Sequence, residues 1–375
     1  MAIGDSVAEA LPEAPGRVAV VLGTRPEAVK LLGVIRGLGE DAFVVHTGQH
    51  YSPEMAEEFQ GGIGLPAPAI QLEVGGVTRG RQIGEATARI DDLLSGNRFR
   101  AVVVQGDTNT ALAGALAANA AGLPLVHVEA GLRSYDRAMP EEHNRVVVDH
   151  LADLCCAPTE TSRANLAAEG ICGDDRVVVT GNTVVDAVGW LRPTAAEVDA
   201  MLGSRNLRRN DFVLATFHRP ENVDDPEVLA TIISELVALP VPVVWPLHPR
   251  TAARARDAGL GGLLDDLRVE PPAGYATFLG LASACALLIS DSGGVQEEAS
   301  VLKRPVVVVR HSTERPEVIG TFSVLVSPGG RVGAAARERL ADVPGLLSRL
   351  ATISCPYGDG DASAKCVAAI RRRVG

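Results

Sequence analysis

Short apolar runs recur along this chain, and each is followed by a turn of glycine or polar residues before the next helical segment. The runs are typical of buried β-strands, and strands that alternate with helices build doubly wound parallel sheets. The chain is therefore predicted to have an α/β fold. The predicted strands are residues 17–22, 42–46, 101–105, 125–128, 176–179, 212–216, 243–245, 286–290 and 305–309.

Two domains are predicted, facing each other across a deep cleft. The alternation stops at residues 190–211, which are predicted to be polar and irregular, and then starts again. A length of 375 residues also fits two domains, at roughly 150 residues each. We expect a mobile N-terminal tail over residues 1–16, an N-terminal domain over 17–188, a C-terminal domain over 189–355, and a final segment over 356–375 that is helical and basic from 361 to 373.

Composition excludes several classes of protein. The hydrophobic fraction of 46% is ample for two cores, and the 3% of aromatic residues means that Ala, Val and Leu must build them. The formal net charge of -11 argues against non-specific nucleic-acid binding, which needs a basic surface. We expect no secretion signal and no membrane span, because no apolar run approaches the ~18 residues that a span needs.

The cysteines and histidines give no sign of a metal site. The six cysteines are scattered without a Cys-x-x-Cys pair, and no zinc-ligand spacing involves the eight histidines. Free cysteines in a chain of this size are usually buried and reduced. The sequence therefore predicts a cytoplasmic protein with mostly buried thiols and no metal.

Three carboxylates are candidates for acid–base chemistry. Asp107 and Glu129 come directly after predicted strands, and Glu141 follows a proline that marks a helix start. Residues at the carboxyl ends of parallel strands line the ligand crevice, so these groups suggest proton transfer. Other roles stay open: Asp107 could cap the helix that begins at Thr108, and Glu141 could complement a helix dipole. Glu129 needs a partner or a ligand, because it ends a buried strand.

Arg145 lies four residues after Glu141, on the same helical face. The two side chains could form a structural ion pair, or Arg145 could bind an anion beside the carboxylate.

Two turns are candidate phosphate sites. Arg25 and Lys30 flank a predicted helix start in which Pro26 and Glu27 suit the first turn. Anions bind well at helix N-termini, although an ordinary strand-to-helix turn with solvated charges would look the same.

The second turn, Ser292-Gly293-Gly294, opens a helix after a buried strand. Its two glycines leave the backbone amides bare, so a phosphate could sit there. Glu298, one turn further, could accept hydrogen bonds from ribose hydroxyls. The alternative is a glycine turn in which Ser292 caps the helix.

His218 and Arg219 follow another predicted strand directly. Histidine is suited to donate a proton to a phosphate leaving group near neutral pH, although a structural histidine is common at such positions. His248, in a loop shaped by two prolines, is a weaker candidate.

With these residues in view, the chain resembles the non-hydrolysing UDP-N-acetylglucosamine 2-epimerases. The likeness extends from Val18 to residues 356–360, and its segments occur in one order. The segments that carry it are residues 23–30, 105–110, 127–133, 140–145, 180–183, 291–298 and 313–317.

The resemblance implies the GT-B fold, with two Rossmann-like domains and a final helix that crosses back to the first domain. It implies a C2 epimerisation by anti elimination of UDP to 2-acetamidoglucal and re-addition, with no cofactor. The acid–base groups would be Asp107, Glu129 and Glu141, and His218 would sit by the leaving phosphate. The nucleotide sugar would be bound by Arg25, Lys30, Gln49, His50, Arg145, Arg219, His248, Ser292, Gly293, Gly294, Glu298 and Arg315.

Departures from the family pattern leave the sugar open. Gln49-His50-Tyr51 differs from the Gln-His-Arg of regulated bacterial members, so we expect no strong allosteric dependence on UDP-N-acetylglucosamine. The same residues are shared with relatives that act on UDP-2,3-diacetamido-uronic acids. Alternatives are therefore a modified UDP-N-acetyl sugar, a hydrolysing epimerase that releases ManNAc and UDP, or a non-catalytic nucleotide-sugar-binding protein. The resemblance also suggests a homodimer.

Overall fold

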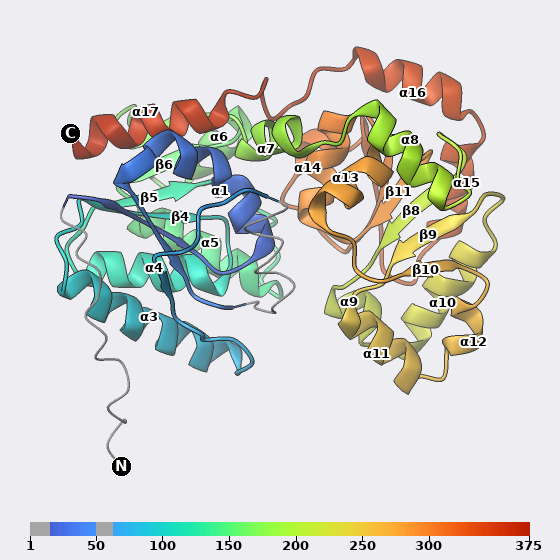
Figure 1. Cartoon of the computed structure of the whole chain (residues 1–375), viewed down its shortest axis with the longest axis horizontal. Coiled ribbons are helices and arrows are strands. Elements are labelled where there is room, and N and C mark those ends of the chain that lie inside the picture. The colour runs from blue at the N-terminus through green and yellow to red at the C-terminus, as the bar shows by residue number, and fades with distance from the viewer. Residues whose placement is uncertain (1–15, 50–62) are drawn as a thin grey trace. The chain divides into compact units, whose positions relative to one another are not determined.

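The structure is a computed structural model that describes residues 16–49 and 63–375. The chain divides into two compact units (Figure 1): residues 1–132, 136–186 and 360–375 form the first, and residues 133–135 and 187–359 form the second. The predicted tail at 1–16 lies outside the described residues except for Gly16, whose amide donates to the Arg98 carbonyl at 2.7 Å.

The first unit is built on a seven-stranded parallel sheet in the order β3-β2-β1-β4-β5-β6-β7. Its strands are β1 (Val18–Leu22), β2 (Ala42–His46), β3 (Ile70–Gln71), β4 (Ala101–Gln105), β5 (Leu125–Val128), β6 (Leu154–Ala157) and β7 (Val177–Val179). Its helices are α1 (Arg25–Leu38), the 3-10 turn η1 (Gly39–Asp41), α3 (Arg79–Ser95), α4 (Asn109–Ala120), α5 (Pro140–Leu151), α6 (Glu160–Ala168) and α17 (Ala362–Val374). Helix α7 (Thr183–Leu191) carries the chain from the first unit into the second.

The second unit is built on a six-stranded parallel sheet in the order β10-β9-β8-β11-β12-β13. Its strands are β8 (Val213–Thr216), β9 (Val243–Pro246), β10 (Arg268–Glu270), β11 (Leu287–Ser290), β12 (Val306–Val309) and β13 (Ser323–Val326). Its helices are α8 (Ala195–Ser204), α9 (Pro220–Val223), α10 (Pro226–Val237), α11 (Pro249–Asp257), α12 (Gly261–Leu264), α13 (Tyr275–Ala284), α14 (Gly293–Leu302), the 3-10 turn η3 (Pro316–Val318), α15 (Val332–Leu340) and α16 (Val343–Thr352).

The central strands are apolar because both of their faces are covered. All residues of β1 and β4 are buried, and helices lie on both faces of the sheet, as Figure 1 shows for the first unit. Such strands have continuous apolar sequences rather than alternating ones. The predicted α/β class with parallel sheets is therefore confirmed.

Small residues let α4 pack closely on the sheet. A Cβ atom added to Gly114 would lie 2.8 Å from Cγ1 of Val104 on β4. The helix begins where Thr108 accepts a hydrogen bond from the Ala111 amide at 3.0 Å. Thr108 is thus the cap of α4, and the role of Asp107 as its cap was wrong.

The prediction that residues 190–211 are irregular was also wrong. This stretch contains α8, whose N-terminus is closed by a capping box. Thr194 accepts from the Glu197 amide, and the Glu197 carboxylate accepts from the Thr194 amide at 2.8 Å. This pattern satisfies two amides at a helix start, so polar residues there mark a helix and not a loop.

The final helix α17 belongs to the first unit. It packs against α1 so closely that a Cβ atom on Gly37 would lie 2.8 Å from Cγ2 of Val367. Its first turn is held by Asp186, whose carboxylate accepts from the Ser363 amide at 3.0 Å. Within the described residues, no helix is long and apolar enough to cross a membrane.

Candidate active site

The first unit has its topological switch point between β1 and β4. From β1 the sheet runs to β2 and β3 on one side and to β4 through β7 on the other. Ligands of doubly wound sheets bind beyond the carboxyl ends of the strands at such a point. Strands β4 and β5 end level with one another, because Gln105 pairs with Val128. This register sets Asp107 and Glu129 at the same edge of the sheet.

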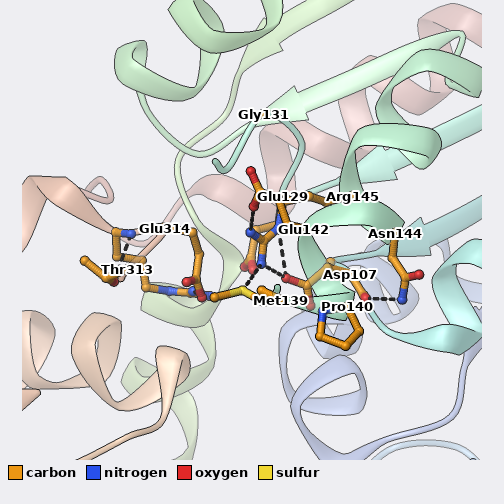
Figure 2. A network of polar contacts seen from close by, with 12 residues as sticks. Asp107, Glu129, Gly131, Met139, Pro140, Glu142, Asn144, Arg145, Thr313 and Glu314 are labelled. Carbon is orange, nitrogen blue, oxygen red and sulfur yellow. Dashed lines mark hydrogen bonds and ion pairs between the residues drawn. The ribbon is translucent and has the colours of Figure 1, made fainter. Parts of the chain in front are cut away.

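Asp107 is held between α5 and the end of β4 (Figure 2). Its Oδ2 atom accepts from Arg145 Nε at 3.1 Å and also from the Arg145 Nη2 group. The Asp107 carbonyl accepts from Asn144 at 2.8 Å. Arg145 is buried and also pairs with Glu142, whereas the Asp107 side chain is 25% exposed. The arrangement keeps Asp107 as an anion that solvent or a ligand can reach.

Arg145 therefore pairs with Asp107 and Glu142 rather than with Glu141. Glu141, in the first turn of α5, is half-buried. A proline begins this helix, as predicted.

Glu129 is held more deeply. Its Oε2 atom accepts from Lys30 of α1 in a buried ion pair and from Asn182 Nδ2 at 3.0 Å. Its backbone has a φ of 70°, a left-handed conformation that is uncommon for residues other than glycine. Strained backbone of this kind is kept where the surroundings over-determine it, often at functional sites.

Glu27 is a buried carboxylate that the sequence assigned only to a helix turn. It accepts from the Gly23 amide at 3.0 Å, from Thr24 at 2.8 Å and from Thr108 at 2.6 Å. It thereby joins the turn after β1 to the turn after β4. Burial raises the pKa of Glu27 to about 7, against the opposing effect of its hydrogen bonds from Thr108, Thr24 and Gly23.

A buried His–Asp pair supports both carboxylate turns. His127 on β5 has Nδ1 at 2.7 Å from Asp149 and Nε2 at 2.9 Å from the Gly106 carbonyl. The Asp149 carboxylate also accepts from the Gly131 amide at 3.1 Å. The pair thus fixes the residue before Asp107 and the backbone that follows Glu129.

The turn after β1 is closed by side chains. A Cβ atom on Gly23 would collide with Thr47 Oγ1 and Thr110 Oγ1, so packing alone requires glycine there. Gln49 accepts from the Thr110 amide and hydroxyl at 2.9 Å, which fixes it on the first turn of α4. Arg25 is the first residue of α1, and the candidate His50 lies outside the described residues.

The second unit has its switch point between β8 and β11. Thr216 pairs with Ser290, so the residues after the two strands meet. The Asp291 carboxylate accepts from the amides of His218 and Arg219 at 3.0 and 2.8 Å, and it lies 3.1 Å from His218 Nδ1. The Arg219 side chain donates to the Asp291 carbonyl at 3.0 Å.

The turn at Ser292-Gly293-Gly294 forms the N-terminus of α14. Ser292 occupies the cap position, but its side chain makes no capping hydrogen bond. A Cβ atom on Gly293 would lie 2.6 Å from Arg315 Nη1, whereas one on Gly294 would meet only open space apart from Ser292 Oγ at 4.0 Å. The helix start therefore has the bare approach that an anion needs.

The other candidates of this unit have protein partners. Glu298 accepts from the Tyr275 hydroxyl at 2.9 Å. Arg315 is buried in ion pairs with Glu297, at 2.7 Å, and with Glu314. His248 caps α11 by accepting from the Arg250 amide at 3.2 Å, and its ring lies 6.3 Å from that of His218.

Sequence reasoning missed the residues that hold these groups in place. They are Glu27, His127, Glu142, Asn144, Asp149, Asn182, Tyr275 and Asp291. All of them except Asp149 and Tyr275 lie in segments that carry the family resemblance, which is the signal that could have identified them. Over residues 16–49 and 63–375, no cluster of three His, Cys, Asp or Glu side chains could hold a metal ion.

Comparisons with known proteins agree on one family. The chain matches the family model described as UDP-N-acetylglucosamine 2-epimerase over residues 38–371. It is 37% identical to UDP-N-acetylglucosamine 2-epimerase of Methanococcus maripaludis over 356 residues, which cover 92% of this chain and 96% of the relative. It is 35% identical to UDP-2,3-diacetamido-2,3-dideoxy-D-glucuronate 2-epimerase of Pseudomonas aeruginosa over 360 residues, which cover 93% of this chain and 98% of that relative.

A solved structure extends the likeness to the fold. The Methanocaldococcus jannaschii UDP-GlcNAc 2-epimerase, in complex with UDP-GlcNAc and UDP, matches with a TM-score of 0.84 and 36% identity, covering 95% of this chain and 99% of that one. The GT-B fold expected from the resemblance is therefore confirmed. With two parallel Rossmann-like sheets and a family match along most of its length, this chain belongs to the UDP-N-acetylglucosamine 2-epimerase family.

Proposed function

We propose that this chain catalyses the reversible epimerisation of UDP-N-acetylglucosamine at C2, giving UDP-N-acetylmannosamine. The observation that carries the proposal is the pair of carboxylates at level strand ends, Asp107 beside Arg145 and Glu129 beside Lys30. Cations keep both carboxylates ionised, so each can accept a proton. Relatives of this chain are named for this activity.

The chemistry needs only acid–base groups. One carboxylate takes the proton from C2, the C–H electrons form the C1–C2 double bond, and the C1–O bond breaks with its electrons passing to UDP. Return of a proton to the opposite face of C2 and attack of the UDP oxygen on C1 then give the epimer. No atom is oxidised or reduced overall. Asp107, Glu129 and Glu141 are the proposed acid–base groups, and positioned groups of this kind typically contribute 10²–10⁴-fold to a rate.

The second unit is proposed to hold the nucleotide. The uncapped start of α14 at Ser292, Gly293 and Gly294 suits the diphosphate. Glu298, oriented by Tyr275, suits ribose hydroxyls, and His218 suits the departing phosphate. The further proposed contacts are Arg25, Gln49, His50, Arg219, His248 and Arg315.

The test is incubation with UDP-N-acetylglucosamine in deuterated water, followed by NMR of the sugar. Deuterium at C2 in intact UDP-N-acetylmannosamine is the expected result. Release of free ManNAc and UDP would indicate a hydrolysing epimerase instead. Binding of UDP without any exchange at C2 would refute the proposal and would leave a nucleotide-sugar-binding protein or an epimerase of a different sugar.

A modified sugar is a second candidate substrate. The relative from Pseudomonas aeruginosa is named for UDP-2,3-diacetamido-2,3-dideoxy-D-glucuronate and is 35% identical, close to the 37% of the relative named for UDP-N-acetylglucosamine. The same exchange assay with both sugars, compared by kcat/KM, separates the two. A larger kcat/KM for the uronate would reassign the substrate.

We also propose that the protein works as a homodimer. Leu116 on α4 and Val147 on α5 are 37% and 41% exposed, and these two helices pack side by side. Apolar side chains exposed on adjacent helices are suited to burial against a second copy. Light scattering should give twice the monomer mass, and Leu116→Glu should lower it.

A cytoplasmic location is proposed from the thiols. The six cysteines are thiols and not disulfides, and four of them are buried. Burial raises the pKa of the Cys285 thiol to about 12, which keeps it protonated and unreactive. Free thiols are typical of reducing compartments, and fractionation of cells that express the protein would test this location.

A further inference from the structure

We infer that Asp291 is a positioning residue that orients the ring of His218, with a protonated Nδ1 turned toward the Asp291 carboxylate and Nε2 left for a ligand. The assignment concerns the ring itself. Its use in catalysis rests on the proposed function.

The register of the sheet brings the two residues together. Strands β8 and β11 are neighbours, and Thr216 pairs with Ser290 at their ends. His218 and Asp291 therefore follow level strand ends at the switch point of the second unit. The Thr216 and Ser290 hydroxyls also hydrogen-bond across the strands at 2.7 Å, which fixes the base of the arrangement.

The surroundings of Asp291 favour its anion. The carboxylate is completely buried. It accepts from the His218 amide, from the Arg219 amide and from Asn222 Nδ2, at 3.0, 2.8 and 3.1 Å. These three groups can only donate. Hydrogen bonds from donors stabilise a carboxylate in its charged form, and a buried charge with several donors is well satisfied.

The anion determines which nitrogen of His218 carries a proton. Nδ1 lies 3.1 Å from Oδ1 of Asp291, and an anion at this distance favours a proton on Nδ1 over a lone pair. The hydrogen bond of one ring nitrogen sets the state of the other. The His218 side chain is 46% exposed. The Nε2 side of the ring is therefore accessible, while the Nδ1 side faces the buried Asp291 carboxylate.

This geometry suits a group that faces a leaving phosphate. With Nδ1 turned toward Asp291, the outward nitrogen is Nε2, and in the charged ring Nε2–H can donate a hydrogen bond to the phosphate oxygen as the C1–O bond breaks. When UDP returns, the same donor holds the oxygen in place. A ring with its single proton on Nε2 and a bare Nδ1 would face the Asp291 anion with a lone pair, which is unfavourable.

The direct test is the protonation of the His218 ring, which requires no activity. Protein labelled with ¹⁵N-histidine is examined by NMR over a range of pH, and the His218 signals are identified by their loss in His218→Gln. The expected result is a proton on Nδ1 in the neutral ring, with Nε2 as the nitrogen that responds to added UDP. A proton on Nε2 with a bare Nδ1 in the wild-type protein would overturn the inference.

A variant separates positioning from general structure. Asp291→Asn should shift the proton of the neutral ring toward Nε2 and lower kcat by ~10- to 100-fold, because a misplaced general acid loses part of its usual contribution. The matched control is Asp225→Asn, which replaces an exposed carboxylate that caps α10 in the same unit and should change neither measurement.

A double-mutant cycle completes the test. If Asp291 acts through His218, Asp291→Asn should cost less than ~3-fold in kcat when it is added to His218→Asn, since coupled residues are not additive. If the kcat losses of the two single variants multiply in the double variant, the two residues act independently and the inference is overturned. Absence of wild-type turnover would instead refute the proposed function, while the NMR result on the ring would still stand or fall by itself.

Discussion

The carboxylates of the first unit differ in how their charge is compensated. Asp107 and Glu129 each pair with a cation, whereas Glu27 has only hydrogen-bond donors around it. A carboxylate beside a cation stays ionised, and a buried one without a cation holds its proton to higher pH. Asp107 and Glu129 are therefore suited to accept a proton, whereas Glu27 keeps its own proton to higher pH.

Removal of the charge at either paired carboxylate should abolish most of the activity. Asp107→Asn and Glu129→Gln should each lower turnover by at least ~100-fold, the usual scale for a general acid or base. The measurement is the rate of C2 deuterium exchange at saturating substrate. Asp153→Asn is a control, because Asp153 forms a surface ion pair with Arg373. Turnover near the wild-type value in both variants would remove these carboxylates from the mechanism.

Glu27 should make stability depend on pH. Its pKa is raised by burial to about 7, well above that of a carboxyl group in water, so the folded protein binds a proton more tightly than the unfolded chain. The stability from this group is complete below about pH 4.5 and is lost as pH rises through about 7. The shift corresponds to about 3 kcal/mol at most.

Glu27→Gln should remove that loss. The amide oxygen can accept from Gly23 and Thr24, and the amide nitrogen can donate to Thr108. The melting temperature of the variant relative to the wild type should therefore rise between pH 5 and pH 8. If the melting temperature of the variant relative to the wild type stays constant or falls between pH 5 and pH 8, ionisation of Glu27 does not destabilise the folded protein.

At the level of secondary structure elements, helix α4 packs closely on the sheet because its side chains are small. Helix α4 is rich in alanine and lies against the sheet through Gly114 and its neighbours. The sequence predicted the helix and its small residues. It did not indicate that the residues are small because the helix approaches the strands closely.

Gly114→Ala should therefore destabilise the first unit. The added methyl group would lie 2.8 Å from Val104 Cγ1, and overpacking of this kind costs about 1–3 kcal/mol. Gly84→Ala in α3 is the matched control, because a Cβ atom there meets nothing within 4 Å. It should stabilise the protein by about 0.5–1 kcal/mol. Chemical denaturation of both variants gives the comparison, and equal effects would contradict the packing argument.

At the level of the whole molecule, the last residues complete the first unit. Helix α17 buries Cys366, Val367 and Ile370 and packs against α1 and β6. The first unit is therefore built from both ends of the chain, and the second unit from the middle.

Removal of α17 should weaken the first unit selectively. A chain that ends at Asp359 should unfold in two calorimetric transitions, the lower one assigned to the first unit. Ile370→Ala should act in the same direction and cost about 2–5 kcal/mol, as for other large-to-small changes in cores. Arg373→Ala, on the exposed end of the helix, should stay within about 0.5 kcal/mol. A single transition at the wild-type temperature in the shortened chain would refute the role of α17.

Much of the fold followed from local sequence. Every predicted strand appears within one or two residues of its predicted ends, because a strand buried on both faces must be continuously apolar. The edge strands β3, β10 and β13, the inner strand β6 and the helix α8 were missed. The edge strands are short and partly exposed, so their apolar signal is weak. Strand β6 is fully buried but has only four residues, two of them cysteines, and the polar start of α8 was mistaken for a loop.

The sequence by itself determined which residue types follow each strand, and so which groups gather at the carboxyl edge of each sheet. Only the tertiary structure decided their partners. Local helix spacing suggested Glu141 for Arg145, yet Arg145 pairs with Asp107, which follows strand β4. Likewise Lys30 pairs with Glu129, and His218 with Asp291. A buried charge requires a partner, and strand order, which spacing along the chain does not encode, determines which partner is within reach.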